Sequence, residues 1–243
     1  MNKNMVKTAW KIALINLRTL KTPYFVTALL IGFNLFLIGA MMVGIAKTQG
    51  MSSPGLHIAS GGAPFVLTIM AAIFIPTVNF RRICNLGGNR QSFFLGSLIA
   101  YVLIAIGASL VGMAEYLGID AFVKFVESSP RGYFIQTLHL VSLWTEGGIV
   151  VGFFKLVAHM FWLAIFVHVL AAVQGKWYGW AADVGLVMIS AAFRPLAPLN
   201  NALDWFFSVT ISNPGAPAQI LSCFVLGIAL YALSWPVMAR KAI

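Results

Sequence analysis

Three ionisable side chains lie within or beside apolar runs, where charge is costly and often functional. Lys155 and His159 are one helical turn apart, and Glu115 lies near the end of an earlier apolar run. Residues at i and i+4 share a helix face, so Lys155 and His159 could point together into a polar cavity and bind an anionic group or pair with Glu115. The alternative is structural, with Lys155 extended towards the interface and His159 hydrogen-bonded to a neighbouring helix. The three residues are candidates for lining a polar path.

No catalytic or metal-binding pattern accompanies these residues. Gly175-Lys176 is followed by Trp177 and has no glycine five residues before Gly175, so it is not a phosphate-binding Walker A loop. Cys84 and Cys223 are far apart and form no CxxC pair, which predicts free thiols and neither a disulfide framework nor a zinc site. We therefore expect no enzyme activity, no metal and no cofactor in this chain.

The composition is that of a protein surrounded by lipid. Of 243 residues, 60% are hydrophobic and 9% are charged, against about 25% charged in soluble domains. Too few ionisable residues remain to cover a soluble surface. The net charge of +10 comes from Lys and Arg beside apolar runs, without a nucleic-acid-binding motif. This placement favours a membrane partner and argues against nucleic acid.

Six apolar stretches approach the length of about 20 residues that crosses about 30 Å of hydrocarbon. The fifth is the weakest because Asp183 and Arg194 lie near its ends, and without it the chain would have five spans. The predicted fold is an all-α integral membrane protein, a single transmembrane domain over residues 1–243 with six transmembrane helices. The six stretches are residues 23–46, 63–80, 93–117, 149–173, 177–197 and 219–239.

Residues 4–22 predict an amphipathic helix ahead of the first span. At about 100° per residue, apolar residues gather on one side and basic residues on the other, while Ile15 and Asn16 break the pattern. Such a helix suits the anionic cytoplasmic interface, lying in the membrane plane. Pro23 is the expected break before the first span. The apolar side comprises Val6, Ala9, Trp10, Ala13, Leu17 and Leu20.

Lysine and arginine mark one side of the predicted membrane domain. With the N-terminus inside, eleven of them fall on the cytoplasmic side and four outside. The positive-inside rule therefore places both termini in the cytoplasm. Two outside segments are long: residues 118–148, with candidate helices at 121–127 and 134–144, and residues 200–217, a candidate re-entrant segment.

The richest local pattern follows the second span. Residues 86–94 read Leu-Gly-Gly-Asn-Arg-Gln-Ser-Phe-Phe and come shortly after the basic pair Arg81 and Arg82. Apolar, basic and flexible residues between two spans on the cytoplasmic face offer a place for a partner to bind. The alternative is a plain positive-inside loop.

Together, the N-terminal helix, residues 86–94 and Glu115 resemble the permease subunits of bacterial ABC exporters in which the ATPase and the six-span permease are separate chains. The loop resembles a signature of leucine, glycine, arginine and two phenylalanines that follows the second span in some of these permeases. Glu115 lies where they often have an acidic residue late in the third span. The likeness is clear over residues 79–117 and architectural elsewhere.

The resemblance implies a multi-pass protein of the bacterial cell membrane that exports an amphipathic peptide or lipid-like substrate. It also implies a second permease copy or homologue, and a cytoplasmic ATPase subunit that carries the ATP and Mg. Glu115, Lys155 and His159 would line the translocation path, and the loop would bind the ATPase as a coupling helix. The expected coupling residues are Arg81, Arg82, Leu86, Gly87, Arg90, Phe93 and Phe94.

Two other classes of function stay open. A non-transporting scaffold or immunity subunit would use the same loop to recruit a partner that hydrolyses no ATP. A membrane-embedded enzyme is disfavoured because the sequence offers no clustered His, Asp or Glu site on facing helices.

Overall fold

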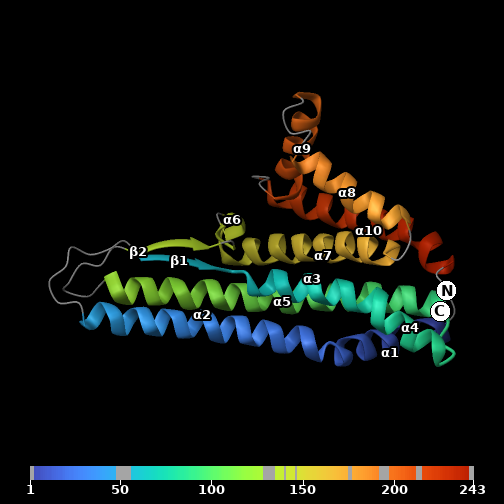
Figure 1. The fold of residues 1–243 in the computed structure, drawn as a ribbon, viewed down its shortest axis with the longest axis horizontal. Coiled ribbons are helices and arrows are strands. Elements are labelled where there is room, and N and C mark those ends of the chain that lie inside the picture. The colour runs from blue at the N-terminus through green and yellow to red at the C-terminus, as the bar shows by residue number, and fades with distance from the viewer. Residues whose placement is uncertain are drawn as a thin grey trace.

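The computed structural model describes residues 3–47, 56–127, 135–139, 141–145, 147–174, 177–191, 197–211 and 215–240. The regular elements of these residues are helices and two short strands (Figure 1). The helices are α1 (Lys3–Thr19), α2 (Lys21–Lys47), α3 (Ala63–Phe74), the π-helix η1 (Ile75–Asn79), α4 (Phe80–Asn85), α5 (Arg90–Glu127), α6 (Ser142–Thr145), α7 (Ile149–Val173), α8 (Trp177–Ala191), α9 (Ala197–Thr210) and α10 (Ala216–Arg240). The strands are β1 (Leu56–Ser60) and β2 (Ile135–His139).

Four helical stretches among the described residues are long and apolar enough to cross a membrane. They are Ala63–Asn85, Arg90–Ala121, Ile149–Val173 and Ala216–Arg240. The first joins α3, η1 and α4, so it continues past the predicted boundary at residue 80. The second has 32 residues, or about 48 Å of helix, and therefore extends beyond a hydrocarbon layer of about 30 Å. The chain thus has the helices of a multi-pass membrane protein.

The first predicted span begins at a bend. The pair Asn4–Thr19 and Lys21–Leu37 is bent by 47° and would count as a fifth crossing if it formed one broken span. The break lies at Leu20, between α1 and α2, and not at the predicted Pro23. Proline is tolerated in the first turn of a helix, where its missing N–H leaves no hydrogen bond unmade. Pro23 therefore falls inside the start of α2.

Helix α8 is the short element among the predicted spans. It covers Trp177–Ala191, 15 residues, or about 22 Å. This length alone does not cross about 30 Å of hydrocarbon. The rest of the predicted fifth span, residues 192–196, lies outside the described residues, apart from Ala197, the first residue of α9. The described part of the predicted fifth span is therefore too short to cross the membrane by itself.

The strands β1 and β2 pair in parallel, with Leu56 opposite Ile135 and Ser60 opposite His139. Residues 135–139 thus form a strand inside the candidate helix 134–144, while residues 121–127 continue α5. Strand pairing joins segments far apart in sequence, which local periodicity does not reveal. A two-stranded sheet has open edges, so this pair belongs outside the hydrocarbon layer.

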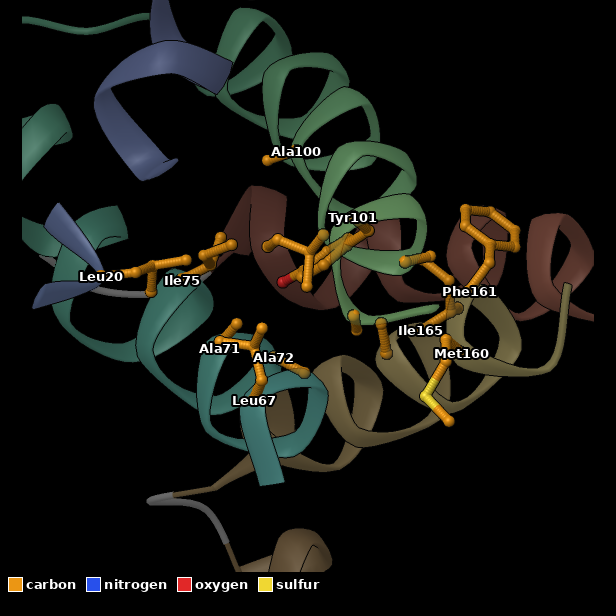
Figure 2. Close-up of a cluster of buried hydrophobic side chains, with 14 of the residues drawn as sticks. Leu20, Leu67, Ala71, Ala72, Ile75, Ala100, Tyr101, Met160, Phe161 and Ile165 are labelled. Carbon is orange, nitrogen blue, oxygen red and sulfur yellow. The ribbon is translucent and has the colours of Figure 1, made fainter. Parts of the chain in front are cut away.

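The core lies where α3, α5 and α7 pack together. Small buried side chains, among them Ala105 and Ala108 of α5, allow these helices to approach closely. Larger side chains of α5 and α7 complete the core. Figure 2 shows this cluster, with Ala71 and Ala72 from α3, Tyr101 from α5, and Met160 and Ile165 from α7, all fully buried.

The N-terminal helix packs against α5 along a side that overlaps the predicted apolar side. Its buried residues are Ala9, Ile12, Ala13 and Asn16. Ala9 and Ala13 belong to the predicted apolar side, whereas Val6 and Trp10 of that side are exposed. Close approach depends on a glycine of α5. A Cβ on Gly96 would lie 2.6 Å from the backbone oxygen of Ala9. Helix α1 therefore packs closely on α5 at Gly96.

The start of α1, helix α4 and the end of α10 lie at one end of the molecule (Figure 1). Strands β1 and β2 lie towards the opposite end. The guanidinium of Arg90, the first residue of α5, donates a hydrogen bond to the backbone oxygen of Ala239 near the end of α10. This contact ties the turn between α4 and α5 to the C-terminal helix.

Candidate functional site

The turn between α4 and α5 has a defined backbone built on two glycines. Gly87 has φ +80°, and its N–H donates to the Cys84 oxygen at 3.0 Å. The Gly88 N–H donates to the Ile83 oxygen at 2.9 Å. These two bonds are the Schellman pattern that ends a helix on a left-handed residue. A Cβ on Gly88 would lie 2.6 Å from the Ile83 side chain, so both positions require glycine.

The other arm of the turn is capped by Asn89. Its Oδ1 accepts a hydrogen bond from the Gln91 N–H at 2.8 Å, and its backbone oxygen accepts from the Phe93 N–H at 2.9 Å. An asparagine that bonds the N–H two residues on is a helix N-cap. The Gly-Gly-Asn sequence therefore joins α4 to α5 as a fixed hairpin. We call residues 80–94 the α4–α5 hairpin.

The side chains at the tip of the α4–α5 hairpin are exposed. Leu86 is 81% exposed, and Arg81 and Arg82 are also exposed. A single exposed leucine is ordinary on a protein surface. Here, however, it stands on a rigid turn beside two cations, an arrangement suited to entering an apolar cleft with a polar rim.

At the base of the α4–α5 hairpin, the two arms contact each other and α10. Phe93 packs edge-on against Phe80, with ring centroids 5.2 Å apart. Phe94 stacks on Tyr231 of α10 at 4.1 Å, and the Tyr231 hydroxyl donates to the Phe94 backbone oxygen at 2.6 Å. Movement of the hairpin would therefore be transmitted to α10 through aromatic contacts and a hydrogen bond.

The structure divides the expected coupling residues into two groups. Those with side chains exposed at the tip are Arg81, Arg82 and Leu86, with Gly87 shaping the turn. Those that hold the base are Arg90, Phe93 and Phe94. A partner would thus contact the first group. Arg90, Phe93 and Phe94 instead hold the hairpin in place.

A buried polar cluster next to the hairpin escaped sequence reasoning. Asn79 donates its amide to Asn16 Oδ1 at 3.1 Å and to Thr19 Oγ1 at 2.7 Å. Asn16 in turn lies 3.4 Å from the Ser97 hydroxyl. The cluster joins α1, η1 and α5. The available signal was the position of Asn16, which broke the apolar pattern of the first helix.

Replacing Asn79 with alanine should loosen this junction. The change leaves Asn16 and Thr19 without their shared donor inside the protein, which costs about 1–3 kcal/mol. We expect a melting temperature in detergent several degrees lower than that of the native chain. The measurement is the fraction of protein that stays monodisperse after heating. Asn85→Ala, at an exposed position of α4, is the matched control, and equal losses in both variants would contradict the role of the cluster.

Glu115 lies on the side of α5 that faces α2. Its Oε1 accepts a hydrogen bond from the Gly61 N–H at 3.1 Å and lies 3.5 Å from the Asn34 amide of α2. Gly61 has φ +90°, a conformation that favours glycine at the turn from β1 to α3. Glu115 also lines a pocket of about 550 Å³ between α2 and α5.

Lys155 and His159 are both buried on α7 (each 5% exposed) and are not among the residues that line this pocket. The His159 ring lies among Trp144, Phe65 and Trp162, with centroid distances of 4.9, 6.2 and 5.9 Å. It also hydrogen-bonds the backbone of Thr210 at the end of α9. Of the three predicted path residues, Glu115 therefore lines the pocket, and His159 lies among aromatic rings.

Within the part of the chain that the structure describes, no three His, Cys, Asp or Glu residues gather as a metal site would need. Cys84 and Cys223 are both buried free thiols. No protein-family model, no curated protein and no solved structure matches this chain.

Proposed function

We propose that this chain is the membrane-spanning permease subunit of an ABC exporter and works with a separate cytoplasmic ATPase. The observation that carries the proposal is the α4–α5 hairpin, a rigid turn with Leu86 exposed at its tip beside Arg81 and Arg82. Such a projection has the shape and chemistry of an element that docks in a cleft of a partner.

The proposed topology has six crossings with both termini in the cytoplasm. Helices α2, α3–α4, α5, α7 and α10 would each cross the membrane, and the fifth crossing would need the whole of residues 177–197, of which α8 is a part. Support comes from the end of the molecule that gathers the start of α1, α4 and the end of α10 (Figure 1). This end carries Lys7, Arg81, Arg90 and Arg240, as the positive-inside rule requires of a cytoplasmic face.

The contacts at the base of the hairpin suggest how ATP-driven motion would spread. When the ATPase closes, it would shift the tip of the α4–α5 hairpin. The stack of Phe94 on Tyr231 would carry the shift to α10, and the bonds of Asn79 to Asn16 would carry it to α1. Packed elements of this kind move as units when an interface rearranges. The spans would thereby rock around the transported molecule.

Affinity purification of the tagged chain from its native membranes tests this proposal. We expect a stoichiometric partner with Walker A and Walker B motifs, and ATP hydrolysis by the purified complex that a Walker A lysine substitution in the partner abolishes. Recovery of a partner without ATPase activity would instead favour the scaffold or immunity subunit. Recovery of no ATPase under conditions that keep other membrane complexes intact would contradict the proposal.

A further inference from the structure

The pocket between α2 and α5 is an apolar site with a single carboxylate. Its volume of about 550 Å³ lies in the range of sites that hold small organic ligands. The apolar lining comes from Ile31 and Leu35 on α2 and from Val111, Ala114, Gly118 and Ile119 on α5. The remaining lining residues are Asn34 and Glu115.

The carboxylate of Glu115 is only half satisfied by the protein. Oε1 accepts the Gly61 N–H, whereas Oε2 is shielded from solvent and has no hydrogen-bond partner among the described residues. An ionised carboxylate in such surroundings is costly unless a cation joins it. The next cation along α5, Lys124, is engaged with Asp120 at 2.7 Å, and this bond raises the pKa of Lys124. Because Glu115 lines the pocket, a cationic group held there would place the opposite charge beside this carboxyl group.

We propose that this pocket binds an amphiphile with one protonated amine and one alkyl chain. The ammonium group would lie against Glu115, and the chain would follow the apolar side chains of α2 and α5. A neutral hydrocarbon would fill the same volume but leave the carboxylate unpaired, and an acidic headgroup would be repelled. The inference deepens the proposed function, on which the role of this ligand as transport substrate rests, while binding itself requires no ATPase.

Photolabelling of the purified chain in nanodiscs tests the pocket. The probe is dodecylamine with a diazirine in its alkyl chain, and dodecanol and dodecanoate with the same diazirine are the comparison probes. We expect the amine to label peptides of α2 and α5 around residues 31–35 and 111–119 more strongly than either comparison. Glu115→Gln should reduce labelling by the amine about tenfold, the effect of losing one charge-assisted contact, and leave labelling by dodecanol unchanged.

A second variant blocks the pocket without touching its charge. Gly118 lines the pocket, and a Cβ there would meet nothing within 4 Å, so Gly118→Leu should fold and exclude both the amine and the alcohol. Gly107→Leu is the matched control, because Gly107 is equally open and three turns away on the same side of α5. Its labelling should equal that of the native chain.

Three outcomes would overturn the proposal. Equal labelling by amine and alcohol would show an apolar groove filled by lipid, and labelling unaffected by Glu115→Gln would remove the carboxylate from recognition. A disulfide between two chains carrying Leu35→Cys, with exclusion of the probe, would assign the groove to a second copy of this chain. The labelling experiment contains no ATPase. Its result therefore does not depend on the exporter proposal, which the purification of the native complex tests separately.

Discussion

Leu86→Glu is expected to weaken binding of the proposed ATPase partner at least about 30-fold, the effect of losing about 2 kcal/mol at a central contact. The side chain is 81% exposed at the tip of the α4–α5 hairpin, so the substitution should change the stability of the free chain only a little. In the complex, however, the same side chain would sit in an apolar cleft, where a carboxylate would be desolvated without a partner. Titration of the purified ATPase against the nanodisc-embedded chain measures the loss.

Leu86→Met is the matched control for this result, because it keeps an apolar side chain of similar volume. It should retain binding within about threefold, since volume-conserving apolar changes cost less than about 1.5 kcal/mol and usually much less at a surface. Both variants should elute as the native chain does on size exclusion. Native affinity in Leu86→Glu would remove the hairpin tip from the interface and leave the exporter proposal without its main support.

Arg90 is a poorer probe of the interface than its charge suggests. Its guanidinium donates to the Ala239 backbone oxygen, so Arg90→Glu would remove the tie to α10 and place a carboxylate beside a carbonyl oxygen. A loss of ATPase binding in that variant would not distinguish a broken contact from a displaced helix. Arg81 and Arg82, which are exposed, are the cations to reverse.

Gly96→Leu should destabilise the protein by about 3 kcal/mol, the upper part of the usual range for overpacking. A Cβ at this position would lie 2.6 Å from the Ala9 backbone oxygen and 2.8 Å from the Ile12 side chain. Because the nearest atom is backbone, the clash is relieved only if α1 moves away from α5. Thermal unfolding in detergent should show the loss, and trypsin should cleave after Lys7 and Lys11 faster than in the native chain.

Gly107→Leu separates packing from helix propensity in this experiment. Both substitutions replace a helical glycine of α5 with leucine, which favours the helix by about 1 kcal/mol. A Cβ on Gly107 would meet nothing within 4 Å, so this variant should be as stable as the native chain or more stable. If both variants unfold at the same temperature, α1 is not held by close approach to Gly96.

Sequence alone determined the lipid surroundings of this protein and the turn between α4 and α5. Long apolar runs with 9% charged residues require lipid around the chain whatever the tertiary arrangement, because too few polar groups exist to cover a soluble surface. The Gly-Gly-Asn turn is likewise local. Gly87 supplies a positive φ and Asn89 supplies a cap, and both depend only on residues within one helical turn.

Only the tertiary structure decided which side chains meet. Periodicity grouped Val6 and Trp10 with Ala9 on the apolar side of the first helix. Packing on α5 buries Ala9 together with Ile12 and Asn16 and leaves Val6 and Trp10 exposed. Helical periodicity distinguishes polar from apolar faces but does not tell lipid from a neighbouring helix, since both are apolar surroundings. Asn16 is buried because Asn79, 63 residues later, hydrogen-bonds it.

The same reason explains why Glu115 borders the pocket and Lys155 and His159 do not. Opposite charges in neighbouring spans suggested one site, yet the described contacts of Glu115 come from Gly61 and Asn34. Which face of α5 turns towards α2 and which towards α7 depends on close packing at glycines and alanines along the whole helix. Residue types therefore showed that charges lie inside the membrane domain, and the placement of α2 beside α5 decided that one of them, Glu115, borders a pocket.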